Sequence, residues 1–241
     1  MTIIRWAFLV MAVALAGSAQ AGDFASREII GFSPDGRYFA FEEYGVQDGS
    51  GFPYANIYVI DTTSDRWVPD TPKRVQVNDE TAQLADVRAE ARQQARLLIQ
   101  QYAISEPGQI VATNLYTHLS ATPYQVTVNP RLVAPPIDEH LSLSIDQYKV
   151  VADPVCAGMG SGDTKGFRLT LQRNEASRVL HEDKDRIPSS RSCPLDYRIH
   201  DVVTYFAEPR GAITLAVIVQ IIQIGFEGPD GRFIAVTGRV E

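Results

Sequence analysis

Short apolar segments recur along most of the chain and predict β-strands. "RYFAFEEY" (residues 37–44) follows a turn, and "ANIYVID" (55–61) is apolar on both faces, which is typical of a central strand. Further strands are predicted at "YQVTV", "LSLSIDQYKVVAD", "GFRLTLQ" and "YRIHDVVTYFA". The most apolar segment, "AITLAVIVQIIQI" (212–224), is rich in β-branched residues and predicts a buried strand with a bend or bulge.

One segment has the period of a helix instead. In "NDETAQLADVRAEARQQARLLIQQYA" (78–103), apolar residues recur every three or four positions, which predicts an amphipathic helix over about 79–102 with Asn78 as its N-cap. The apolar stripe consists of Leu84, Val87, Ala91, Ala95, Leu98 and Tyr102. The predicted fold is therefore mainly β with one long amphipathic helix, built of antiparallel hairpins in a propeller-like or sandwich-like arrangement; α+β is the alternative.

Two similar turns are predicted, one near each end of the chain. Ser33-Pro34-Asp35-Gly36 fits a type I turn position by position, and Pro229-Asp230-Gly231 repeats most of it. Both glycines are expected to hold a positive φ at the end of a short hairpin loop. Asp35 is expected to bond its own backbone, which is a structural role.

The N-terminus predicts export. Residues 1–21 combine one early charge, Arg5, with a short apolar run and a small-residue cleavage pattern, so they form a signal peptide cut between Ala21 and Gly22. A retained N-terminal anchor is the alternative, but the run is short for a membrane span. Residues 22–241 are predicted to be a single mainly-β domain, periplasmic or secreted, without stable membrane insertion after the signal is removed.

The chain has two cysteines, Cys156 and Cys193. In an exported protein an even number of cysteines favours a disulfide, so these two are predicted to be bridged. Two free buried thiols are the alternative.

Charge narrows the range of partners. Removing Arg5 with the signal peptide changes the formal net charge from −7 to −8, and an acidic protein is a poor ligand for nucleic acid. Arg88, Arg92 and Arg96 recur at helical spacing and form a basic row. This row is either a solvated face or a docking face for an acidic partner.

No local pattern predicts catalysis, a metal or a cofactor. Ser161 lies outside a G-x-S-x-G pattern. The clusters Asp138-Glu139-His140 and His181-Glu182-Asp183 are expected to be solvated surface, because adjacent residues on a strand point apart. Carboxylate pairs for glycoside hydrolysis are assembled in space, and the first candidates for such a pair are Glu42, Glu43 and Asp48.

Two resemblances extend these expectations. "GFSPDGRYFAF" with "ANIYVIDTTSD" resembles one blade of the TolB-type β-propellers over residues 29–65, which implies a propeller-like hairpin. With "SRSCPLDYRIHDV" and "GFEGPDGRFIAVTG", the whole chain resembles a family of predicted secreted bacterial proteins of unknown function, which implies export but no activity.

Together these features predict an exported, non-catalytic binding or interaction module of the cell envelope, whose partner is an unknown envelope protein or polymer. The alternative is an envelope hydrolase acting on polysaccharide or peptide.

Overall fold

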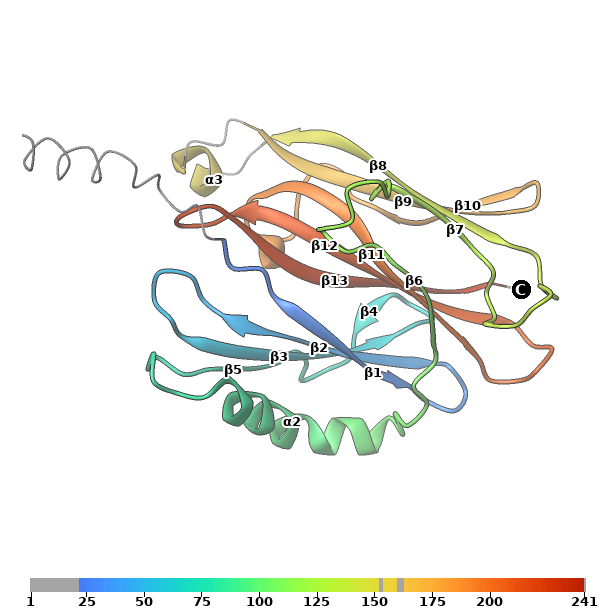
Figure 1. The fold of residues 1–241 in the computed structure, drawn as a ribbon, viewed down its shortest axis with the longest axis horizontal. Helices are drawn as coiled ribbons and strands as arrows, with labels where there is room; N and C mark the ends of the chain where they lie inside the picture. The colour runs from blue at the N-terminus through green and yellow to red at the C-terminus, as the bar shows by residue number, and fades with distance from the viewer. Residues whose placement is uncertain (1–21, 152–153, 160–162, 241) are drawn as a thin grey trace, which may run out of the picture.

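Three antiparallel sheets are stacked face to face, and one long helix covers the outer face of the sheet that contains the N-terminal strands (Figure 1). The computed structural model describes residues 22–151, 154–159 and 163–240. Gly22 of the predicted cleavage site is the first described residue, whereas Ala21 and Ser161 lie outside the described residues. The stacking is sandwich-like, which confirms the mainly β prediction. The blade-like segment 29–65 forms a meander in an open sheet.

The chain first builds the N-terminal sheet, adds one strand to the central sheet, forms the outer sheet, and then returns to complete the central sheet. The N-terminal sheet has the order β1-β2-β3-β4, with β5 also paired to β3; the central sheet has the order β13-β12-β11-β6, and the outer sheet β10-β9-β8-β7. The N-terminal sheet comprises β1 (Ser26–Phe32), β2 (Tyr38–Val46), β3 (Pro53–Asp61), β4 (Arg66–Trp67) and β5 (Lys73–Gln76). The central sheet comprises β6 (Gln109–Thr113), β11 (Pro194–Phe206), β12 (Ile213–Ile224) and β13 (Pro229–Val240). The outer sheet comprises β7 (Gln125–Val128), β8 (Leu141–Val151), β9 (Asp163–Arg173) and β10 (Ala176–Glu182).

The central sheet is buried on both faces, which explains the long apolar run of β12. Leu215, Val217 and Val219 belong to the core shared with the outer sheet, whereas Ala216 and Ile218 belong to the core shared with the N-terminal sheet. A strand covered on both faces has no solvent side, so its residues need not alternate with polar ones. The predicted buried strand is confirmed, but the irregular pairing lies at extra residues of β11, while β12 pairs with β13 without a shift.

The helix α2 (Leu84–Gln101) covers the free face of the N-terminal sheet. Ala91 and Ala95 are fully buried against this sheet, and these small side chains let the helix lie close to β3. The predicted apolar stripe is thus confirmed, but the predicted start is wrong. The N-cap is Gln83, which makes no side-chain cap bond. Asn78 and Asp79 lie ahead of the helix, where Asp79 accepts bonds from the backbone amide and the hydroxyl of Thr81.

Two short helical turns complete the structure, α3 (Pro154–Gly158) and η1 (Ser189–Arg191). Among the residues that the structure describes, no helix has the length and apolar character needed to cross a membrane.

The two echoed turns differ in the structure. Gly36 has a φ of 70° and closes the predicted turn onto the Ser33 carbonyl, while Asp35 accepts bonds from the Ser33 hydroxyl and the Arg37 amide. The prediction for Gly231 is wrong: its φ is not positive, and it already lies in β13, opposite Ile222. The extra residue Gly228 moves the second loop to residues 225–228, ahead of the repeated letters.

This difference predicts unequal costs for the same substitution. Gly36→Ala places a Cβ 2.5 Å from the Thr214 hydroxyl at a positive φ, so it should lower the free energy of unfolding by about 1–3 kcal/mol. At Gly231 the obstacle is the ring of Phe24, a partly exposed side chain that can move, so Gly231→Ala should cost less. Urea midpoints of both variants measure this, and equal losses would contradict the assignment.

Candidate functional site

A polar hollow of about 200 Å³ opens between the N-terminal sheet and the central sheet. We call it the Glu43 hollow, after the buried carboxylate in its wall. Its lining residues come from β2, β3, β4 and β5 on one side and from β12, β13 and the η1 turn on the other. They are Glu43, Asn56, Tyr58, Trp67, Arg74, Ser190, Ser192, Ile221, Gln223, Arg232, Phe233 and Ile234.

Glu43 faces the hollow because of the alternation of β2. Phe41 and Glu43 point toward the central sheet, so the intervening Glu42 points the other way, toward α2. The Glu43 carboxylate is 2% exposed and accepts bonds from the Asn56 amide at 3.1 Å and the Phe233 backbone amide at 2.6 Å. Burial raises the pKa of Glu43, and these two bonds only partly offset the effect of burial.

Arg232 lies beside Glu43, and Asp23 holds its guanidinium group in place. Its Nη2 bonds the Asp23 carboxylate at 2.6 Å, and its Nη1 donates to the Asp23 carbonyl at 2.7 Å. The Tyr54 hydroxyl donates to the same carboxylate at 3.1 Å. Burial alone would lower the pKa of Arg232, but Tyr54, Asp23 and Glu43 together raise it, so the guanidinium stays charged beside the hollow. Asp23 is not itself a lining residue.

Aromatic and basic side chains form the mouth of the hollow. The Trp67 ring is 43% exposed and lies 5.6 Å from the ring of Tyr58. Burial, followed by the neighbouring Glu43, raises the pKa of the Tyr58 hydroxyl, which interacts with both Glu43 and Arg74. The hollow therefore presents the Glu43 carboxyl group, two guanidinium donors, an amide and an open indole face.

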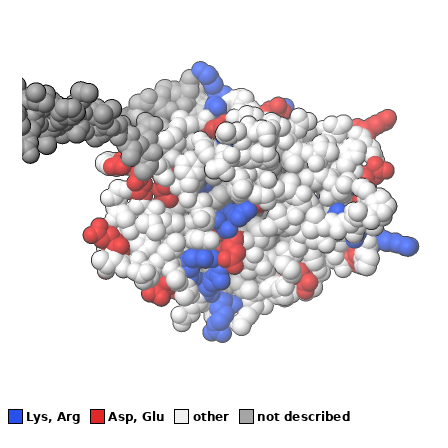
Figure 2. All heavy atoms as spheres, viewed as in Figure 1, with Lys and Arg blue, Asp and Glu red and all other residues white. Residues whose placement is uncertain are grey.

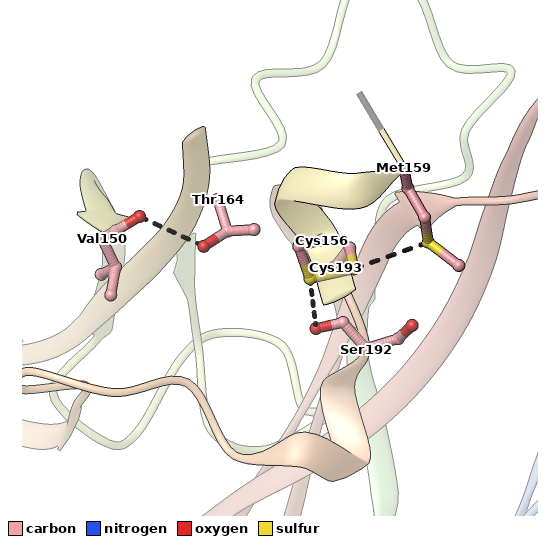
Figure 3. Close-up of a disulfide and its surroundings, with 6 residues drawn as sticks. All are labelled: Val150, Cys156, Met159, Thr164, Ser192 and Cys193. Carbon is pink, nitrogen blue, oxygen red and sulfur yellow. Dashed lines mark hydrogen bonds between the residues drawn. A yellow bond between two sulfur atoms is a disulfide. The ribbon is translucent and has the colours of Figure 1, made fainter. Parts of the chain in front are cut away.

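The disulfide fixes one wall of the hollow. Cys156 in α3 and Cys193 are bridged at an S–S distance of 2.06 Å, and both are buried, which confirms the predicted bridge (Figure 3). Ser192 directly precedes Cys193 and has a φ of 54°, an unusual conformation for a residue with a Cβ. Ser190 and Ser192 line the hollow. The bridge therefore ties this wall to α3, the short helix between β8 and β9 of the outer sheet.

The other candidate carboxylates do not join Glu43. Glu42 is fully buried under α2, and its carboxylate bonds Arg88 and Arg92. Asp48 lies in the loop between β2 and β3, where it accepts a bond from the Gly49 amide. The three residues are therefore dispersed, and no pair of them shares one cleft.

The predicted basic row is present, but its members differ in their contacts. Nη2 of Arg88 and Nη2 of Arg92 lie 2.9 and 2.7 Å from the Glu42 carboxylate, and both guanidinium groups also pair with Glu28. Arg96 is exposed and lines a separate groove beside β1. Figure 2 shows basic side chains gathered in a band over α2 and the strands above it. The role of the row as a partner face stays a prediction.

The expectation of solvated acidic clusters is wrong for Asp183. This residue is 6% exposed, and Arg191 Nη1 bonds both of its oxygens at 2.8 and 2.7 Å. His181 adds a contact of 3.1 Å. Burial alone would raise the pKa of Asp183, but His181 and Arg191 lower it. Adjacent residues do point apart, yet the fold covers one of them. In the described ranges, no group of three or more His, Cys, Asp or Glu side chains is placed to hold a metal.

The chain is similar to a known protein family over most of its length. A family model described as a predicted secreted protein (DUF2259) matches residues 40–239. No curated protein matches the chain. The matched range contains every lining residue of the hollow, whereas Asp23, the ion-pair partner of Arg232, lies before it.

Proposed function

The chain belongs to the predicted secreted protein family (DUF2259), and on that premise we propose that it is a non-catalytic binding module of the cell envelope whose Glu43 hollow holds one sugar unit of an envelope polysaccharide. The observation that carries this proposal is the convergence of Glu43, Arg232 and the open indole of Trp67 on one small hollow. Sugar hydroxyls both donate and accept hydrogen bonds, and the apolar faces of sugar rings pack on aromatic side chains. The envelope location, with the periplasm as its compartment, is part of the proposal.

The rival function, polysaccharide hydrolysis, is less well supported by the geometry. Glycoside hydrolysis uses two carboxyl groups that flank the scissile bond. Among the residues that line the hollow, Glu43 is the single carboxylate, and Asp23 is held behind Arg232 by its ion pair. Incubation with soluble polysaccharides followed by a reducing-end assay should therefore show no release of products above a protein-free control. Release that depends on Glu43 would establish the hydrolase instead.

Trp67 provides a direct readout of sugar binding. The chain has two tryptophans, Trp6 and Trp67, so a protein that begins at Gly22 has Trp67 as its one indole fluorophore. Titration with N-acetylglucosamine, its disaccharide with N-acetylmuramic acid, glucose and galactose should give a saturable change in Trp67 emission for at least one of them. If none of these sugars changes the emission, the proposal fails.

Glu43→Gln should weaken binding of the sugar by about 2- to 10-fold. A typical hydrogen bond contributes about 0.5–1.5 kcal/mol, and each 1.4 kcal/mol is a factor of ten in affinity. Glu90→Gln, on the exposed side of α2, is the matched control and should leave affinity unchanged. An unchanged affinity in a folded Glu43→Gln variant would show that the indole reports binding elsewhere.

A further inference from the structure

Strand β1 is an open edge of the N-terminal sheet. It ends the strand order and pairs with β2 alone along its length. Outside the sheets, backbone bonds reach its ends, where Ala25 bonds Gly231 and Phe32 bonds Ser105 and Glu106. Between these points, residues 26–30 have no backbone partner on the outer side among the residues that the structure describes, whereas the Glu106 carbonyl lies against Gly31. An exposed strand edge is a template for pairing with another strand.

An apolar groove lies beside this edge, under α2. It has a volume of about 430 Å³, and we call it the α2 groove. Buried Ile57 and Ala95 are among its lining residues, together with the half-buried Ile29, Ile30 and Ile99. Its remaining lining residues are Glu28, Arg92, Arg96 and Gln100. A strand added to β1 would direct every second side chain toward this groove.

The charges at the rim indicate which side chains fit. Arg92 is neutralised by Glu28 and Glu42. Arg96, one helical turn further, is exposed, and no ion pair joins it to a carboxylate in the described part of the chain. Arg96 lines the α2 groove together with Ile30 and Ile99, so an acidic side chain that pairs with Arg96 would lie next to an aliphatic side chain in the groove.

We infer that β1 and the α2 groove together dock an extended segment of a partner polypeptide as an added strand, with an aliphatic side chain in the α2 groove and an acidic side chain at Arg96. Backbone bonds along β1 would supply affinity, and the two side-chain contacts would supply specificity. This surface is separate from the Glu43 hollow, because the hollow lies on the face of the N-terminal sheet toward the central sheet, whereas the α2 groove lies on the face toward α2. The inference does not depend on the sugar-binding proposal.

Selection of short random peptides displayed against the protein beginning at Gly22 tests the inference. Enriched peptides should combine a branched aliphatic residue with Asp or Glu two positions away. In fluorescence anisotropy with such a peptide, Arg96→Glu should weaken binding at least about fivefold, since it replaces an exposed ion pair with repulsion. Arg66→Glu on β4, the same change at an exposed arginine outside the groove, should leave affinity unchanged. Glu43→Gln should also leave it unchanged.

Hydrogen exchange locates the bound peptide. The outward-facing amides within residues 26–30 should exchange more slowly in the complex, as expected for a strand edge that gains backbone bonds. Failure to enrich any peptide, protection confined to other segments, or equal affinity of Arg96→Glu would each overturn the inference. Sedimentation of the protein alone gives a further outcome. A dimer that protects residues 26–30 in the absence of peptide would make a second copy of the chain the occupant and overturn the assignment to a partner.

Discussion

Urea unfolding of the protein without its Cys156–Cys193 bridge should show about 4 kcal/mol less stability than unfolding of the bridged protein. The two cysteines are 37 residues apart in sequence, and a bridge that closes a loop of this length removes much conformational freedom from the unfolded chain. The loss should appear in the Cys156→Ser, Cys193→Ser double variant as a lower denaturation midpoint. The double variant avoids leaving one unpaired buried thiol, so it measures the bridge more cleanly than either single change.

The same change should also affect the Glu43 hollow. Ser190 and Ser192 lie in the segment that the bridge ties to α3, so their wall should become more mobile when the bridge is absent. Sugar titrations at low urea, where the variant is folded, should therefore show weaker binding than in the bridged protein. Wild-type protein reduced with dithiothreitol lacks the bridge but keeps both cysteine side chains, so it is the control. Its denaturation midpoint and its sugar affinity should match those of the double variant. Equal midpoints for reduced and oxidised wild-type protein would contradict the expected stabilisation.

Periodic features of the chain were predictable because they depend on local geometry. The stripe through Val87, Ala91 and Leu98 marks the buried face of α2, since helical spacing determines which residues share a side. The β-branched run of β12 likewise predicts a buried strand. The start of α2 was less predictable, because Asn78 and Asp79 suit a turn as well as a cap, and the structure uses them in the turn.

Features that depend on sheet stacking were not predictable from one sequence. Adjacent Glu42 and Glu43 have identical side chains, yet one is neutralised by arginines of α2 and the other lines a hollow at the central sheet. Which of them faces which layer depends on the register of β2 and on the order of the sheets. Arg232 directly follows the repeated Pro229-Asp230-Gly231, but no local pattern indicates that it would meet Asp23.

Asp183 and Asp201 show the same limit for buried ion pairs. The partner of Asp201, Arg27, comes from the first strand, whereas the partner of Asp183, Arg191, lies 8 residues further along the chain in η1. The first pair connects two sheets whose contact is a property of the whole fold, and the second depends on how the chain turns back after β10. A local sequence pattern could not identify them.

Asp201→Asn is expected to lower the free energy of unfolding by about 3–5 kcal/mol, the range for breaking one side of a buried ion pair. The Asp201 side chain is fully buried in β11, and Arg27 of β1 donates two bonds to it at 2.6 and 2.8 Å. The Thr113 hydroxyl of β6 donates a third at 2.7 Å, and His200 Nδ1 lies 3.1 Å away. Asparagine keeps the shape but leaves the Arg27 charge uncompensated at the contact between two sheets. Asp185→Asn, at an exposed position, should change stability little.

The acid dependence of stability tests the same ion pair without relying on one variant. Burial alone would raise the pKa of Asp201, but His200 and Arg27 lower it from 3.8 to about 2. A carboxyl whose pKa is lower in the folded state stabilises that state fully above its unfolded pKa and loses the contribution as pH falls through the folded pKa. Asp201 should therefore contribute on the order of 2 kcal/mol above about pH 4, and this contribution should disappear between about pH 4 and pH 2. Urea midpoints measured across that window should fall more steeply for wild type and for Asp185→Asn than for Asp201→Asn. Parallel acid slopes for all three proteins would show that Asp201 does not titrate with a lowered pKa, and the ion pair with Arg27 would then not have the assigned role.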